Sequence, residues 1–394
     1  METLDYTSWG LSLRRRVAGR RVPLGGTIEL TRRCNNRCVH CYNNLPADDR
    51  TAQAGELGEG AWKRLLDEAA EAGCLYLLFT GGEPLLRPDF GALYEHARRL
   101  GFLVTLFTNG TRLTEETADL LAAMPPLAVE VTLYGATRAT WERVTGVPGS
   151  YARSLAGIER LRRRGVRLRL KTTLSRLNRH ELGGMRRLAA SFAAPFRFDA
   201  LLNARIDRSR GPLAVRLSPE EVVVLDLADP ERVRALRETA PGPPPESPGP
   251  LACGAGFHAF AVDPCGRLRL CALCGEEEGF DLRRGSFREG WEGWVARERA
   301  RFTGPEGPCS ACGLIDLCGV CPEAARLECG EESAPVDFLC RVAHLRAFAL
   351  GIPVPRHGPC PFCPGGAGHE EMAALAAALR ASFLAAPLGG DRRA

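Results

Sequence analysis

Residues 29–42 read ELTRRCNNRCVHCY and carry three closely spaced cysteines, Cys34, Cys38 and Cys41. This C-x3-C-x2-C triple directly follows a run, residues 27–31, that has the length of a β-strand. Thiolates so close together can hold one iron–sulfur cluster from a single loop, and three ligands on a four-iron cluster leave one iron open. Zinc is the alternative, but zinc knuckles use cysteine pairs and need a second pair to complete a tetrahedron. The triple therefore favours a [4Fe–4S] cluster with an open iron.

The composition is typical of a globular protein large enough for two domains, and it limits the classes of function. The sixteen cysteines stand mostly in clusters at metal-ligand spacing, which indicates metal sites in a reducing, cytoplasmic compartment instead of a disulfide framework. The sequence shows neither a secretory signal nor an apolar run long enough to span a membrane. The net charge of +5 is spread along the chain without a basic stripe, so nucleic-acid binding is not expected.

Strand-like and helix-like segments alternate through the first half of the chain. The run 74–80 is apolar without alternation, as is usual for a parallel strand covered on both faces. Repeated strand–helix units of about thirty residues predict an α/β fold with a parallel sheet. Residues 222–227 fit either a strand or a helix. The expected strands are 27–31, 74–80, 103–107, 127–133, 166–172 and 196–199, with helices at 90–100, 115–123 and 150–164.

A glycine-rich motif, Gly81, Gly82, Glu83 and Pro84, follows the second expected strand. Active sites of α/β barrels lie at this carboxyl end of the strands. Two adjacent glycines let the backbone approach a ligand closely, and exposed main-chain groups can bind the charged end of an amino acid. The tetrapeptide alone is a common turn, but its position behind the cysteine triple favours a ligand-binding role.

With both motifs, the chain resembles the radical S-adenosylmethionine (radical SAM) superfamily. The resemblance implies a partial (β/α)6 barrel in which S-adenosylmethionine chelates the open iron and is cleaved reductively to a 5'-deoxyadenosyl radical. It also implies that residues 81–84 bind the methionine amino group and that His40 and Tyr42 lie beside the adenine. Asn109 and Thr132, at the ends of the third and fourth expected strands, would meet the ribose and the methionine carboxylate or serve as strand-end caps.

Twelve of the sixteen cysteines follow residue 250, in a region that resembles a SPASM domain with auxiliary iron–sulfur clusters. By this resemblance, the ligands of one auxiliary cluster are Cys309, Cys312, Cys318 and Cys340. The other cluster would take three ligands, which are Cys253, Cys271 and Cys321.

Several features of the cysteine-rich region stay open. The fourth ligand of the second auxiliary cluster is Cys265, Cys274 or an open position that binds substrate. The family commonly has three residues between the last close pair of cysteines, whereas only Gly319 and Val320 stand there in this chain. Zinc is again the alternative, because C-x2-C pairs by themselves are typical of zinc sites.

The expected organisation has five parts, with a proline-rich stretch between barrel and cysteine-rich domain. The roles of Cys329 and of the Cys360/Cys363 pair in the tail are not assigned by any motif: the pair may ligate a metal, exchange disulfides or do neither. The parts are a basic segment 1–24, the barrel 25–240, the linker 241–250, the SPASM domain 251–350, and a tail 351–394 that ends in a short helix, 371–385.

The motifs at 134–137, 141–146 and 149–151 look most like radical SAM maturases of ribosomally made peptides. The resemblance implies hydrogen abstraction from a peptide or protein substrate and formation of a thioether or carbon–carbon crosslink. The implied partners are an electron donor such as flavodoxin or ferredoxin, and a separate leader-binding protein or direct leader recognition by this body. One alternative is a sulfatase-type or enzyme-subunit maturase. Sulfatase maturases tend to have an acidic residue directly after the cysteine that corresponds to Cys271, whereas this chain has Ala272 at that place. Another is a non-catalytic iron–sulfur carrier or scaffold, which would not need residues 81–84.

Overall fold

The structure is a computed structural model, which describes residues 10, 12–13, 16–17, 19–238, 253–275, 278–301, 309, 312–356 and 358–385. The expected linker 241–250 and most of the expected basic segment lie outside the described residues. Within the described ranges, no helix has the length and apolar character needed to cross a membrane.

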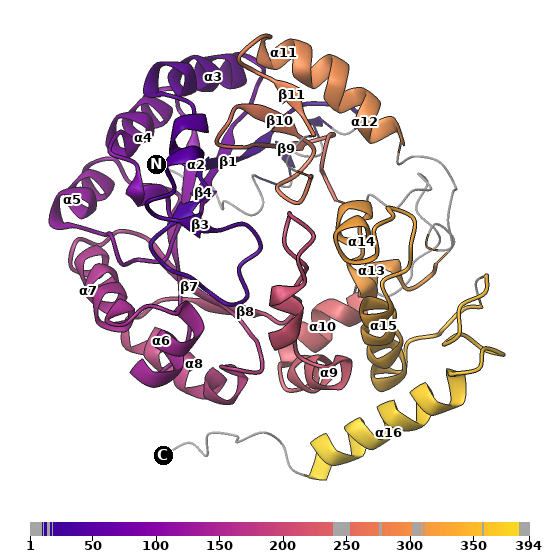
Figure 1. Cartoon of the computed structure of the whole chain (residues 1–394). Coiled ribbons are helices and arrows are strands. Elements are labelled where there is room, and N and C mark those ends of the chain that lie inside the picture. Colours follow the sequence, from indigo (N-terminus) through magenta and orange to yellow (C-terminus); the bar gives the residue numbers. More distant parts are fainter. Residues whose placement is uncertain are drawn as a thin grey trace.

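A curved parallel sheet organises the first two thirds of the chain (Figure 1). Six strands pair in parallel, each with the next along the chain, which confirms the predicted α/β barrel architecture. Buried and half-buried positions alternate along residues 103–108 and 168–173, as in strands with one fully covered face, whereas residues 128–131 are all buried. The strands are β1 (Gly25–Thr31), β4 (Tyr76–Gly81), β5 (Leu103–Thr108), β6 (Ala128–Thr132), β7 (Leu168–Thr173) and β8 (Phe196–Asp199).

The helices that connect these strands form an outer arc around the sheet (Figure 1). All of them except the one at residues 50–55 bury residues on one face: in the helix at residues 59–71, Trp62, Leu65, Leu66 and Ala69 recur at helical spacing and are all buried. The helices are α2 (Arg50–Gly55), α3 (Glu59–Glu71), α4 (Phe90–Arg99), α5 (Glu115–Ala123), α6 (Arg138–Thr145), α7 (Ser150–Arg163) and α8 (Leu182–Ser191), with short 3-10 turns η1 (Pro84–Leu86), η2 (Arg179–Glu181) and η3 (Gly211–Val215).

The C-terminal part of the chain adds three strands to the same sheet. Strand β9 (Ala259–Val262) pairs in parallel with β1, and β10 (Arg267–Arg269) and β11 (Phe280–Asp281) follow antiparallel. A side chain on Gly26 would overlap the Phe260 ring, so the glycine permits this close pairing. The sequence did not indicate that this region would extend the barrel sheet across β1, whose edge would otherwise stay unpaired.

In Figure 1 the remaining helices continue the ring from both ends of this arc: residues 287–289 lie beside α3, and residues 219–227 lie near α8. The undecided segment 222–227 is helical, within α9 (Pro219–Leu227), because Ser218 and Glu221 form a capping box at its start. The long helix α15 (Asp337–Leu350) packs on α9 and on α13 (Ile315–Cys318). The other elements are α10 (Pro230–Glu238), α11 (Phe287–Glu289), the π-helical turn η4 (Gly290–Val295), α12 (Ala296–Arg301), α14 (Pro322–Cys329) and α16 (His369–Ala385).

One hydrophobic core continues from the barrel into the cysteine-rich region, from Ile28 in β1 to Val342 in α15. A buried ion pair crosses between the two parts: Arg346 Nε of α15 lies 2.8 Å from Asp226 Oδ2 of α9. A second, smaller core lies under α16 and consists of Val223, Leu345, Ala349, Met372 and Ala376. The two parts of the chain are therefore packed together through shared apolar and charged contacts.

Candidate active site

The loop after β1 holds its three cysteine side chains close together. Cys34 is buried, Cys38 and Cys41 are half-buried, and each of Cys34 and Cys38 interacts electrostatically with the other thiols. Burial is the largest effect on the Cys34 thiol and raises its pKa to about 12, with a further contribution from Glu83. Because three adjacent thiolates in such a place would repel one another, a bound metal centre supplies the positive charge that this donor set requires. The predicted triple thus forms a fitting site for a cluster.

Polar groups surround the sulfur atoms of this loop. The Asn36 backbone N–H donates to Cys34 Sγ at 3.4 Å, and Asn109 Nδ2 donates to the same sulfur at 3.7 Å. The Tyr134 hydroxyl is hydrogen-bonded to Cys38. Hydrogen bonds to sulfur tune iron–sulfur centres, so these donors suit a cluster. Asn109 was predicted for the site; Tyr134 was part of a family motif but was not predicted as a site residue.

The far end of the loop is fixed by Glu29 and Arg205. Glu29 Oε1 accepts hydrogen bonds from the Tyr42 hydroxyl at 2.9 Å and from Asn43 Nδ2 at 2.7 Å. Arg205 donates to the Cys41 carbonyl at 3.0 Å. Tyr42, predicted beside the adenine, therefore turns its hydroxyl to a buried carboxylate of β1 and anchors the loop.

A buried charged network holds the start of the loop. Arg33 contacts both oxygens of Glu56, at 2.9 and 3.0 Å, and the Thr31 hydroxyl bonds the same carboxylate. Arg87 joins Glu56 at 3.4 Å to the Leu30 carbonyl at 3.1 Å. The sequence did not predict this network, because nothing in the polar segment around Glu56 indicates which arginines its carboxylate contacts in the folded protein.

The glycine motif lies directly against the cysteine loop. Gly82 N donates to the Thr31 carbonyl at 2.7 Å, and Glu83 N donates to the Arg33 carbonyl at 2.9 Å. Gly81 has φ 141°, and a Cβ at Gly81 or Gly82 would overlap backbone atoms of residues 31–33. The glycines therefore allow the ends of β1 and β4 to meet. What they approach closely is the backbone of residues 31–33.

Glu83 links the glycine motif to the end of β5. Its carboxylate is buried and accepts from the Thr108 hydroxyl and the Asn109 N–H, each at 2.7 Å. Burial raises the pKa of Glu83 to about 7, although the Asn109 and Thr108 bonds act in the opposite direction. Asn109 Nδ2 in turn donates to Asn35 Oδ1 at 3.0 Å. Glu83, Asn109 and the cysteine loop are thus one connected unit at the carboxyl ends of the strands.

Two other predicted residues lie nearby. The His40 ring is 6.1 Å from the Tyr134 ring, and burial lowers the pKa of His40 to about 4. Its Nδ1 has no hydrogen-bond partner within the described part of the chain. Thr132 is the last residue of β6 and is half-buried. Both positions are compatible with a ligand that lies over the strand ends.

The first group of C-terminal cysteines surrounds a cavity of about 180 Å³. The predicted four, Cys309, Cys312, Cys318 and Cys340, all line it, although they come from separate segments. Burial raises the pKa of each of the four thiols. Electrostatic interactions among the thiols act in the same direction. Cys360 of the tail lines the same cavity, which the sequence did not indicate.

The second group has Cys271 and Cys274 in direct contact. Their side chains are hydrogen-bonded, and Cys321 interacts electrostatically with Cys271 and Cys253. Cys265 instead lines another pocket, with Gly55 of α2 and Arg32. The structure therefore brings Cys274 to Cys271, one of the three thiols that the sequence matched, whereas Cys265 lies in a different pocket.

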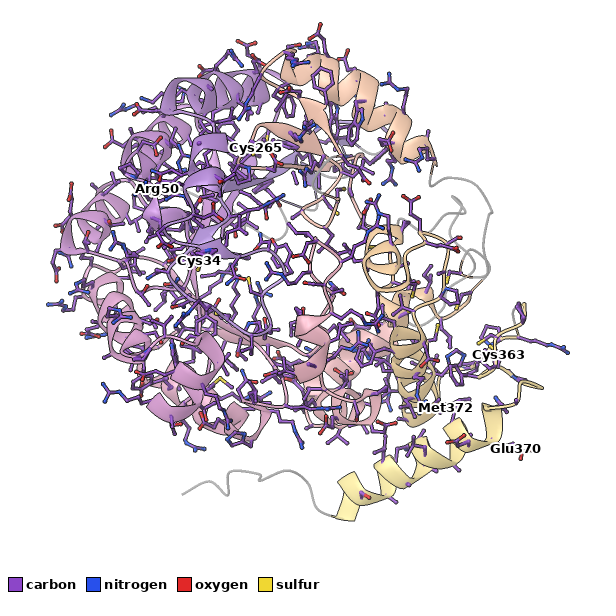
Figure 2. All side chains as sticks on the ribbon, in the orientation of Figure 1. Cys34, Arg50, Cys265, Cys363, Glu370 and Met372 are labelled. Carbon is purple, nitrogen blue, oxygen red and sulfur yellow. The ribbon has the colours of Figure 1, made fainter. Side chains whose placement is uncertain are left out.

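Figure 2 shows Cys34 within the ring of elements and Cys363 on the other side of the molecule, beside α15 and α16. The fold and site together define an iron–sulfur enzyme with a thiol-lined loop at the strand ends of an open barrel. Comparisons with known proteins agree. Residues 28–189 match the Radical SAM superfamily.

Two curated relatives and one solved structure are similar over most of the chain. The chain is 30% identical to an AdoMet-dependent heme synthase of Methanosarcina barkeri, covering 77% of this chain and 92% of the relative. It is 30% identical to a PqqA peptide cyclase of Rhodopseudomonas palustris, covering 82% and 88%. SuiB of Streptococcus suis, solved with S-adenosylmethionine, has the same fold with a TM-score of 0.62 at 16% identity, covering 86% and 82%.

The chain belongs to the radical SAM superfamily. It is accordingly an enzyme that uses S-adenosylmethionine and a [4Fe–4S] cluster, as the sequence predicted. The alternative of a non-catalytic iron–sulfur carrier is set aside.

Proposed function

We propose that this enzyme modifies a ribosomally made peptide by hydrogen abstraction and joins two of its atoms in a thioether or carbon–carbon crosslink. The supporting observation is that the chain matches a relative named PqqA peptide cyclase over 88% of that relative, at 30% identity. The match extends past the barrel and therefore includes much of the cysteine-rich region.

Cys34, Cys38 and Cys41 hold the first cluster, and S-adenosylmethionine bound there supplies the 5'-deoxyadenosyl radical that abstracts hydrogen. The protein's own part is to place this chemistry and to exclude water. The backbone of residues 81–84 fixes the cysteine loop and offers main-chain groups to the methionine end. Asn109, whose amide already contacts Cys34 and Asn35, orients the loop and the cofactor together. His40, Tyr134 and Thr132 line the region above the strand ends.

The region 251–350 is proposed to be a SPASM domain with two auxiliary clusters. One would be held by the cavity group, Cys309, Cys312, Cys318 and Cys340. The other would be held by Cys253, Cys271 and Cys321, with Cys274 as the fourth ligand because its thiol contacts Cys271. Clusters held by these thiols would supply one-electron redox chemistry beside the barrel.

The partners that this function requires are a peptide substrate and a reductant. A flavodoxin or ferredoxin would reduce the first cluster, and a separate leader-binding protein or this body would hold the leader of the peptide. Each of these proteins works in the cytoplasm, where the thiols stay reduced.

A porphyrin is the second candidate substrate. The chain matches a relative named AdoMet-dependent heme synthase, and the match covers 92% of that relative's length. The test compares both classes with anaerobically reconstituted enzyme, S-adenosylmethionine and reductant. One arm contains candidate precursor peptides, taken from short reading frames near the gene, and the other contains iron-free and iron-bound porphyrins. Loss of two hydrogens from the peptide in mass spectrometry, with formation of 5'-deoxyadenosine, supports the proposal. If only the porphyrin changes in mass, the peptide proposal is wrong and the substrate is a tetrapyrrole.

A further inference from the structure

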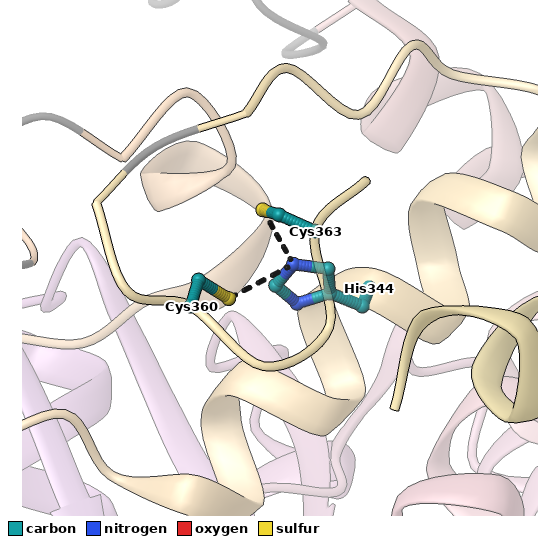
Figure 3. A group of neighbouring side chains, drawn as sticks. All are labelled: His344, Cys360 and Cys363. Atoms are coloured by element: carbon teal, nitrogen blue, oxygen red, sulfur yellow. Dashed lines mark hydrogen bonds between the residues drawn. The ribbon is translucent and has the colours of Figure 1, made fainter. Parts of the chain in front are cut away.

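The tail pair Cys360/Cys363 folds back onto helix α15, where both thiols face His344 (Figure 3). His344 Nε2 lies 3.5 Å from Cys363 Sγ and 3.6 Å from Cys360 Sγ. All three atoms lie within 4.8 Å of one another. His344 and Cys363 are buried, whereas Cys360 is half-buried on the side of the cysteine-lined cavity. A nitrogen and two sulfurs thus converge on one point.

These separations match those between ligands of one tetrahedral ion. Zinc binds thiolate sulfur at about 2.3 Å and imidazole nitrogen at about 2.0–2.1 Å, so two such ligands at a tetrahedral angle lie about 3.6 Å apart. The observed sulfur–nitrogen distances of 3.5 and 3.6 Å agree with that value. Soft sulfur donors with an imidazole favour zinc over the hard cations that prefer oxygen.

The imidazole is held in the tautomer that a metal needs. Its Nδ1 lies 2.7 Å from the carbonyl oxygen of Cys340, one helical turn earlier. A carbonyl can only accept, so Nδ1 carries the proton and the lone pair of Nε2 points to the two thiols. Histidine ligands of metals are commonly fixed by this kind of hydrogen bond from the other ring nitrogen to a backbone carbonyl.

The loop that carries the two cysteines is closely folded. Gly366 N donates to the Cys363 carbonyl at 2.8 Å, and Gly368 N donates to the Pro361 carbonyl at 2.9 Å. A side chain at Gly366 would overlap the Pro361 carbonyl, so only glycine fits there. The C-x2-C spacing and this tight return are typical of a zinc-binding knuckle.

We propose that His344, Cys360 and Cys363 bind one zinc ion that is separate from the iron–sulfur centres, with a solvent molecule in the fourth position. Binding replaces the two thiol protons, which pass to solvent, and no electron is transferred. The ion ties the tail to α15 beside the auxiliary cavity and so fixes helix α16. That helix rests on a small core with Met372 and Ala376, and most of the stability of a helix in a protein comes from such packing.

The test uses full-length enzyme, purified without oxygen or chelator and dialysed against zinc. Metal analysis should find about one zinc per chain besides the iron. X-ray absorption at the zinc edge, which iron does not obscure, should show two sulfurs at about 2.3 Å and nitrogen or oxygen at about 2.0–2.1 Å. Cys360→Ser and Cys363→Ser should each lose the zinc and keep the iron. Cys329→Ser is the matched control, because this exposed thiol lies outside the trio.

The structural role has its own readout. Hydrogen exchange of the amides in residues 369–385 should become about tenfold faster in Cys363→Ser and should be unchanged in Cys329→Ser. Absence of zinc from the wild-type enzyme, or a zinc shell of four sulfurs, overturns the proposal. Loss of iron from Cys360→Ser with zinc retained also overturns it, since Cys360 would then serve the auxiliary cluster. None of these measurements depends on the substrate, so the peptide proposal stands or fails separately.

Discussion

The barrel loop and the C-terminal region both bring thiols together, but they do so by different means. In the barrel, Cys34, Cys38 and Cys41 lie on one loop, whose ends are held by Glu56 and Glu29. In the C-terminal region, the thiols of a single group come from segments as distant as Cys309 and Cys340. The first arrangement depends on local spacing and a buried charged network. The second depends on the packing of whole helices, so its geometry should be more sensitive to a change far from any thiol.

The largest expected effect follows from removing the barrel thiols. Replacement of Cys34, Cys38 and Cys41 together by alanine should abolish formation of 5'-deoxyadenosine, because no ligands remain for the first cluster. The iron content should fall by about four per chain, with the C-terminal iron retained. Iron analysis and chromatography of the reaction products measure both quantities. Loss of all iron would show that the two regions do not assemble independently.

Removing one C-terminal thiol should separate cofactor cleavage from product formation. Cys318 lines the auxiliary cavity and is buried. In Cys318→Ala we expect 5'-deoxyadenosine to form within about threefold of the wild-type rate, since cleavage uses the barrel site, while crosslinked peptide falls at least about a hundredfold. Cys329→Ala serves as the control. Normal product from a variant proven to lack the cluster would mean that the C-terminal region is structural only.

A mutation without any thiol should reveal how far helix packing controls the C-terminal region. Arg346 pairs with Asp226 at 2.8 Å and donates to the Leu317 carbonyl, next to Cys318, at 2.7 Å. Arg346→Met leaves Asp226 buried with only Arg232, and the free energy of unfolding should fall by about 3 kcal/mol.

Denaturant unfolding measures this change in stability. The matched control is Arg163→Met, whose ion pair with Glu115 is exposed, so its loss should leave the free energy of unfolding nearly unchanged. C-terminal iron should be lost at lower denaturant than the barrel iron in Arg346→Met. Simultaneous loss from both regions would contradict the distinction between them.

The last effect depends on pH and concerns a half-buried lysine of the barrel. Lys171 Nζ lies 3.8 Å from Glu130 Oε2, and burial lowers the pKa of Lys171 to about 7 despite the opposing effect of Glu130. In the unfolded chain a lysine stays protonated up to about pH 10. Unfolding is therefore accompanied by uptake of one proton at Lys171 between about pH 7 and 10. The free energy of unfolding should therefore rise with pH in this window, by about 1 kcal/mol per unit.

The measurement compares denaturation midpoints across that pH window. Lys171→Met should flatten the rise, whereas Arg169→Met should leave it, because Arg169 lies on the same strand beside the same carboxylate but is more exposed. A rise that persists in Lys171→Met would assign the proton to another group.

The sequence by itself determined the parts of this protein that depend on local spacing. The C-x3-C-x2-C triple, the glycine motif and the strand–helix repeats identified the parallel barrel and its family, because ligand spacing and hydrophobic period are properties of short segments. It also indicated four thiols that line one cavity.

Only the tertiary structure decided which distant groups meet. It showed β9 beside β1, the contact of Cys274 with Cys271, the bond from Tyr42 to Glu29 and the meeting of Cys360 and Cys363 with His344. No local pattern carries this information, since each contact joins segments whose separation along the chain is set by the packing of the elements between them. Three of the five C-terminal cysteines that the sequence left open are thus distinguished by their partners in space: Cys265 faces α2, Cys274 faces Cys271 and Cys363 faces His344.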